Sequence, residues 1–162
     1  QKNLDFLLEA FQEEKGRCRS MDSYGDGMDK KELEKFISEN NLPGRLMGKI
    51  RNLHEGMKDY DLFVMHSLYE GFSLAVLEGM AMQKPMLLSD IPTFKEQCGD
   101  TAVYFSLNNT NDVVEKIKSL KNDELKLKEL AISGKKRVLE NFTLDHHLAS
   151  LRKIYQQVLS NN

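Results

Sequence analysis

Two short apolar runs stand out in the middle of the chain, at residues 61–65 and 86–88. Runs of this length without polar alternation are typical of parallel strands that are buried on both faces. Between them, residues 74–81 repeat apolar side chains at helical spacing, and Lys84-Pro85 then ends the helix. The pattern therefore predicts a strand, a helix and a second strand, which together make one βαβ unit.

Similar patterns predict further elements on both sides of this unit. Helices are expected over residues 3–11, 30–37, 53–60, 93–98, 113–120, 125–142 and from about 143 to 159, and strands over 45–50 and 102–105. One segment does not fit. Residues 17–24 are polar, although a central parallel strand should be nearly continuous in apolar side chains. We therefore expect this strand to lie at a sheet edge, or to differ in register and exposure.

Alternating helices and strands, followed by helices, predict an α/β protein with a Rossmann-like, doubly wound parallel sheet and a helical C-terminal end. In such sheets, ligands bind outside the carboxyl ends of the strands. Gly25, Ile50, Asp90 and the segment 70–73 all fall at this edge in the predicted order. The sequence thus predicts one ligand pocket.

The loop between the 61–65 strand and the following helix has the chemistry of an anion site. Gly71 allows a close approach of the backbone to a ligand, and Ser73 is a suitable N-cap. The first amides of the helix have no partner within it, so a phosphate can dock there. Glu70 precedes the helix and Glu78 lies about 7 Å along its axis. Carboxylates accept hydrogen bonds from vicinal hydroxyls, so the loop suits a nucleotide sugar.

This stretch resembles a known family. The Glu70-Gly71-Phe72 sequence, the seven residues between Glu70 and Glu78, the strand in front and the run 82–90 behind resemble the donor-binding half of retaining glycosyltransferases of family 4, which have the GT-B fold. The resemblance extends over nearly the whole chain and is most specific from residue 48 to 105. It implies the C-terminal, nucleotide-sugar-binding domain of a glycosyltransferase over residues 1–162.

The resemblance also implies roles for individual residues. At the catalytic site, Glu70 would contact hydroxyls of the transferred sugar and Lys2 would contact the diphosphate. The substrate-binding residues would be Gly71, Phe72, Ser73 and Leu74 for sugar and phosphates, Glu78 for the ribose, Ile50 for the base, and Gly25 in the glycine turn. Plainer interpretations remain open for three of them: a solvated lysine at position 2, a simple turn at Gly25 and a core side chain at Ile50.

Composition narrows the function further. The 162 residues suit one domain, and 23 basic against 25 acidic residues give no basic patch for nucleic acid. No apolar run reaches the roughly 18 residues of a transmembrane helix, so we expect a cytoplasmic protein, with peripheral membrane association open for the full-length protein.

The chain starts at Gln1 inside a helical pattern, and we expect an N-terminal acceptor domain to be missing. Cys18 and Cys98 are expected to be free thiols.

The resemblance leads to the hypothesis of donor binding in a retaining hexosyltransferase that uses a UDP- or GDP-hexose and a glycan or lipid acceptor. The fragment alone is expected to be inactive. The nucleotide sugar is a substrate, no cofactor is expected, and a metal is not required where helix amides and a lysine neutralise the diphosphate. Two alternatives stay open: a nucleotide-sugar epimerase on the same scaffold, and a flavodoxin-like binding module without catalysis.

Overall fold

The computed structural model describes residues 3–13, 20–27, 29–50 and 53–160, in which helices alternate with short strands. The elements are α1 Leu4–Glu13, β1 Met21–Tyr24, α2 Lys30–Glu39, β2 Gly44–Gly48, α3 Leu53–Met57, β3 Phe63–Met65, α4 Leu74–Ala81, β4 Met86–Ser89, α5 Pro92–Cys98, the 3-10 turn η1 Gly99–Thr101, β5 Val103–Phe105, α6 Thr110–Lys121, α7 Glu124–Asn141 and α8 Leu144–Ser160. The predicted order of elements is confirmed.

All strand pairs in the described residues are parallel, as the sequence predicts. The strands form two sheets rather than one continuous sheet: β1 pairs with β2, and β3, β4 and β5 pair in that order. Parallel strands need crossover connections, and here each connection holds at least one helix. The α/β, Rossmann-like fold class is confirmed.

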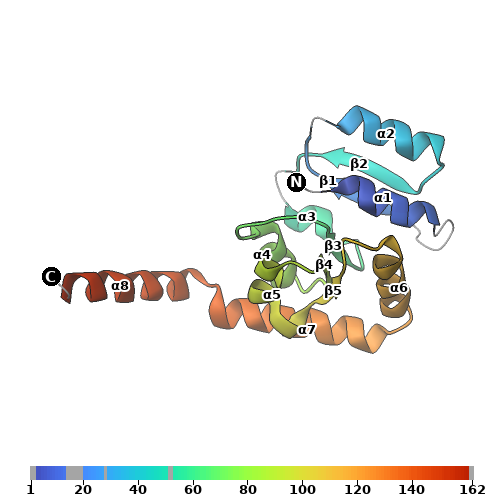
Figure 1. Ribbon diagram of the computed structural model, residues 1–162. Helices are drawn as coiled ribbons and strands as arrows, with labels where there is room; N and C mark the ends of the chain where they lie inside the picture. The colour runs from blue at the N-terminus through green and yellow to red at the C-terminus, as the bar shows by residue number, and fades with distance from the viewer. Residues whose placement is uncertain (1–2, 14–19, 28, 51–52, 161–162) are drawn as a thin grey trace.

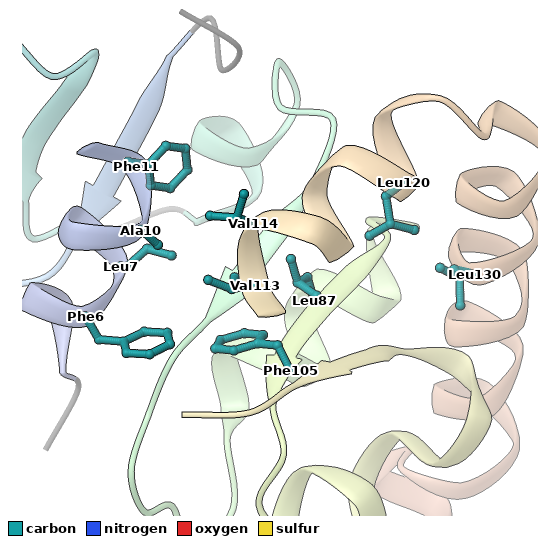
Figure 2. Close-up of a cluster of buried hydrophobic side chains, with 10 residues drawn as sticks. All are labelled: Phe6, Leu7, Ala10, Phe11, Leu87, Phe105, Val113, Val114, Leu120 and Leu130. Carbon is teal, nitrogen blue, oxygen red and sulfur yellow. The ribbon is translucent and has the colours of Figure 1, made fainter. Parts of the chain in front are cut away.

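Two apolar clusters cover opposite faces of the β3–β5 sheet. Leu87 of β4 belongs to the first cluster, in which Phe6 of α1 and Val113 of α6 take part (Figure 2). Its neighbour Leu88 belongs to the second cluster, which includes Met80 of α4. Because successive side chains of a strand point to opposite faces, this alternation shows that helices cover both faces of the sheet.

The last helix, α8, extends away from the other elements (Figure 1). It has no buried residue, and its apolar side chains are exposed. These are Leu144, Leu148, Leu151, Ile154, Tyr155, Val158 and Leu159. Thr143 caps the helix, because its hydroxyl accepts a hydrogen bond from the amide of His146 at 3.4 Å. No described helix is long and apolar enough to cross a lipid bilayer.

A charged network explains why β1 is polar. The Arg45 guanidinium of β2 donates two hydrogen bonds to Asp22 of β1, from Nε at 2.7 Å and from Nη2 at 2.5 Å. The hydroxyl of Tyr60 donates a further hydrogen bond to the same carboxylate. The Asp22 side chain is fully covered, with 0% exposure, so these donors replace the water that it loses on folding. A polar residue of β1 thus helps to hold β1 against β2 in the two-stranded sheet.

This network makes stability depend on pH. The hydrogen bonds from Arg45 hold the pKa of Asp22 below its ordinary value; burial opposes this effect, and the bond from Tyr60 adds to it. A lowered folded-state pKa stabilises the fold above the unfolded pKa of about 3.9, and this contribution is lost as the pH falls further. The Asp22→Asn variant should therefore be less stable than the native chain near neutral pH. Urea denaturation at several pH values should show the difference shrinking below about pH 4.

Candidate functional site

The N-terminus of α4 is built as the sequence predicts. Ser73 is the N-cap, with extended backbone angles (φ −97°, ψ 107°), and its side chain accepts a hydrogen bond from the Val76 amide at 3.4 Å. The residue is itself held by Gln97 of α5. The Gln97 side chain accepts from the Ser73 amide at 3.3 Å and donates to the Ser73 carbonyl at 2.8 Å. The backbone at the start of α4 is therefore held by two hydrogen bonds with Gln97, in addition to the cap from Ser73 itself.

Three hydroxyls hold the loop that precedes α4. Ser67 Oγ donates to Glu70 Oε1 at 2.8 Å, and Ser89 Oγ donates to the Ser67 carbonyl at 2.7 Å. Thr93 Oγ1 donates to the Glu70 carbonyl at 2.7 Å. The Glu70 carboxylate is thus anchored to Ser67, which Ser89 of β4 holds in turn, and the Glu70 backbone is anchored to Thr93 of α5. A carboxylate positioned in this way keeps free lone pairs for a ligand hydroxyl.

The free amides of this loop match an anion site. Within the described residues, the amides of Leu74 and Ala75 have no hydrogen-bond partner, and they lie at the positive end of the α4 dipole. A Cβ added at Gly71 would meet nothing within 4 Å, so the backbone there borders open space. The structure thus leaves room beside Gly71 for a bulky anion.

Glu78 lies on the exposed side of α4. It is exposed, and it stands one turn after Leu74, which is 69% exposed. Residues four apart lie on the same face of a helix, so Glu78 shares a face with the first residue of α4. The two predicted acids therefore flank the free amides in sequence and along the helix, with Glu70 before them and Glu78 behind them.

A second group of predicted residues gathers at the carboxyl ends of β1 and β2. Gly25 follows β1 with a φ of 145°, which favours glycine, and its amide donates to the carbonyl of Gly48 at 2.9 Å. Ile50 packs against α3, because its Cδ1 atom would lie 2.5 Å from a Cβ added at Gly56. The Tyr24 hydroxyl would lie 3.5 Å from the same position. Gly25 and Ile50 therefore lie in the same region, where the carboxyl ends of β1 and β2 meet α3.

Exposed apolar side chains surround the β3–α4 loop. Phe72 is 51% exposed, and its ring centroid lies 5.9 Å from that of Phe142, at the end of α7. Leu68 and Tyr69 are also exposed. Phe72 is thus held by an aromatic contact on one side while its other side stays open to solvent.

Sequence reasoning missed the residues that support the loop, and one predicted residue cannot be placed. Gln97, Ser67, Ser89 and Thr93 make the hydrogen bonds that fix Glu70 and Ser73. A glutamine within a short helix gives no signal of such a role in the sequence. Lys2, which was predicted to contact a diphosphate, lies outside the described residues, so its role stays a prediction.

Comparison with known proteins gives a consistent family match. A family model described as "Glycosyl transferases group 1" matches residues 1–123. An uncharacterized glycosyltransferase of Methanocaldococcus jannaschii is 29% identical over 163 residues, which cover 98% of this chain and 45% of the relative. The poly(ribitol-phosphate) alpha-N-acetylglucosaminyltransferase of Staphylococcus aureus is 25% identical, over 89% of this chain and 31% of that protein. The chain thus spans less than half the length of these relatives.

Solved structures show the same fold at lower identity. A glycosyltransferase from Rickettsia africae matches with a TM-score of 0.90 and 21% identity, over 99% of this chain and 45% of that one. TarM matches with a TM-score of 0.85 and 24% identity, over 95% of this chain and 32% of that one. The Anabaena protein HepE, solved in complex with UDP, matches with a TM-score of 0.82 and 18% identity, over 99% and 46%.

Proposed function

The chain belongs to the group 1 glycosyl transferases, and from this premise we propose that it is the donor-binding domain of a retaining hexosyltransferase of family 4. The donor would be a UDP- or GDP-hexose, and the acceptor a glycan or a lipid. An N-terminal domain of the same polypeptide would bind that acceptor. The fragment alone would bind the donor without transferring the sugar.

The observation that carries this proposal is the anchored β3–α4 loop. Glu70 is fixed by Ser67 and Thr93, and it lies in the loop that leads into the free amides of Leu74 and Ala75. A fixed carboxylate beside unpaired amides suits a ligand that has hydroxyls next to phosphates. A nucleotide sugar has both groups.

Each predicted residue has a place in this proposal. Glu70 would accept hydrogen bonds from the hydroxyls of the transferred sugar, and Glu78 would accept them from the ribose. The backbone of residues 71–74 would face the diphosphate, with Lys2 as a further cation. Ile50 and Gly25 would border the nucleoside, on the side formed by β1 and β2.

The proposed reaction requires groups that stabilise negative charge on the leaving diphosphate. Sugar transfer passes through a cationic sugar while negative charge grows on the departing diphosphate. Oriented amides at a helix N-terminus stabilise such charge without reorganising, and a lysine adds to the effect. The proposal therefore requires no metal ion. Proteins of the same fold have been solved in complex with UDP, and with UDP and GlcNAc, so uridine nucleotides are the first ligands to test.

The proposed role of Glu78 predicts a loss of affinity. Replacing it with alanine should weaken binding of UDP or GDP by about 1–3 kcal/mol, the range for a hydrogen bond to a charged group. Isothermal titration calorimetry with both nucleoside diphosphates measures the change. Glu32→Ala, at an exposed glutamate of α2, is the matched control and should bind as the native chain does. Equal affinities for the native chain and Glu78→Ala would argue against the role.

A further inference from the structure

The short helix α5 holds both ends of the loop that precedes α4. In its first turn, Thr93 donates a hydrogen bond to the Glu70 carbonyl at 2.7 Å. In its last turn, Gln97 accepts from the Ser73 amide and donates to the Ser73 carbonyl. Thr93 and Gln97 are four residues apart, so they lie on the same face of α5. The loop from Glu70 to Ser73 is therefore docked on one face of this helix, and its position depends on where α5 lies.

The helix α5 does not fix its own conformation. It has seven residues, and isolated helices shorter than about 12–15 residues are marginal in water. Its N-cap is Ile91, which makes no side-chain hydrogen bond to the helix. At the other end, the last four carbonyls of a helix have no partner within it. The ordered form of α5 must therefore come from contacts with other parts of the chain.

Donors from outside α5 reach the carbonyls at its end. Arg137 donates from Nε to the Gln97 carbonyl and from Nη2 to the Glu96 carbonyl, both at 2.8 Å. The other donors follow α5 closely in the chain: the Gly99 amide to Lys95, Thr101 Oγ1 to Cys98 and the Tyr104 hydroxyl to Gly99. Arg137 differs from them, because it lies on α7, 40 residues after Gln97. It thus links α7 to the backbone of the residue that holds Ser73.

The surroundings of Arg137 suit this link. A guanidinium carries its donors in a planar, rigid fork that can span two neighbouring carbonyls, and its charge lies at the negative end of the α5 dipole. Gly99 leaves room for it, with a φ of 54° and with Arg137 Nη1 3.3 Å from the position of an added Cβ. The helix α7 itself packs on α4, since a Cβ added at Gly134 would lie 3.7 Å from Met80 Cγ. Arg137 thus ties the end of α5 to a helix that is packed against α4.

We propose that Arg137 is a positioning residue of the candidate donor site. Through α5 it holds the loop that contains Glu70 and Ser73, and so it sets the place of the acid and of the free amides that follow. The inference rests on the proposed function for the identity of the ligand, whereas the link between Arg137 and the loop does not. Because Arg137 acts through the backbone of α5, its removal should loosen this loop more than it loosens the sheet.

Amide hydrogen exchange measured by NMR on chain 1–162 tests the link without a ligand. The Ser73 amide donates to Gln97, and the Leu88 amide belongs to β4, which is paired on both sides. In Arg137→Met, exchange should accelerate at least about 10-fold more at Ser73 than at Leu88, because the loop opens locally. Val113→Ala, in the apolar cluster on the opposite face of the sheet, controls for a general loss of stability and should not raise the Ser73 rate relative to the Leu88 rate. Equal acceleration at the two amides in Arg137→Met would overturn the proposal.

Calorimetry with UDP and GDP tests the consequence for binding. Arg137→Met should weaken the affinity about 3- to 10-fold, within the range for substitutions that act on a site through intervening residues. Arg152→Met, at an exposed arginine of α8, is the matched control and should bind as the native chain does. In a Gln97→Leu background, Arg137→Met should cause a further loss of less than about twofold, because the link to Ser73 is already broken. An unchanged affinity in Arg137→Met, or equal losses in the two backgrounds, would contradict the positioning role.

The two measurements separate this inference from the proposed function. If the native chain binds neither UDP nor GDP, the proposed function fails, and the ratio of exchange rates still decides whether Arg137 holds the loop. If Arg137→Met does not fold, Arg137→Lys takes its place, because a lysine ammonium lacks the rigid fork. It should show the same changes at smaller size. Native exchange and native affinity in Arg137→Lys would then count against the proposal.

Discussion

Replacing Gln97 with leucine is expected to destabilise the fold by about 1–3 kcal/mol, the cost of leaving a buried polar group without its partner. Gln97 is 2% exposed, and its side chain oxygen is the acceptor for the Ser73 amide. Leucine keeps a similar volume, so the expected loss comes from hydrogen bonding. The Ser73 carbonyl keeps a second donor, the Leu77 amide at 3.2 Å. Loss of the hydrogen bond from Gln97 to this carbonyl should therefore cost less stability than loss of the hydrogen bond from the Ser73 amide.

The same substitution should also weaken nucleotide binding, because Ser73 begins the helix whose free amides form the candidate site. Urea denaturation gives the stability change, and calorimetry with UDP gives the affinity. Gln156→Leu, on the exposed face of α8, is the matched control and should stay within about 0.5 kcal/mol of the native stability. If Gln97→Leu unfolds like the native chain, the Gln97–Ser73 bonds do not position the loop.

Hydrophobic periodicity was enough to predict most of the fold. The runs that became β3, β4 and α4 have the lengths and spacings of buried strands and a helix, and Ser73 has the side chain that an N-cap needs. These features depend on short-range chemistry, so they can be read from neighbouring residues. Asp29 has a capping side chain too and stands at the N-cap position of α2, but it makes no side-chain hydrogen bond there.

The features that the sequence did not predict depend on residues far apart in the chain. The polar strand β1 is explained by Arg45 and Tyr60, which are 23 and 38 residues from Asp22. Gln97 is 24 residues from Ser73. The division into two sheets likewise depends on which strands pair, which a run of apolar residues does not specify. For the candidate site, the acids and the helix start were predictable, while their supporting hydrogen bonds were not.

Phe105→Ala should cost more stability than any other substitution considered, about 3–5 kcal/mol, because it removes a large aromatic side chain from a packed core. Phe105 ends β5 and is 1% exposed. It lies among Leu87, Val113 and Phe6 (Figure 2). A small domain is stable by about 5–15 kcal/mol, so this variant should unfold at a clearly lower urea concentration. Phe72→Ala, at a half-exposed phenylalanine, is the matched control and should lose far less.

A double-mutant cycle with Phe6→Ala and Phe105→Ala measures the interaction energy between these two rings, separately from their contacts with the rest of the core. The two rings are nearly parallel, at 10°, with centroids 6.0 Å apart, and such pairs contribute about 0.5–1.5 kcal/mol beyond their burial. A coupling in this range would show that Phe6 docks α1 directly onto β5. A coupling near zero would mean that α1 is held by other contacts of the cluster. Since α1 leads into β1, this contact also determines where β1 lies relative to the β3–β5 sheet.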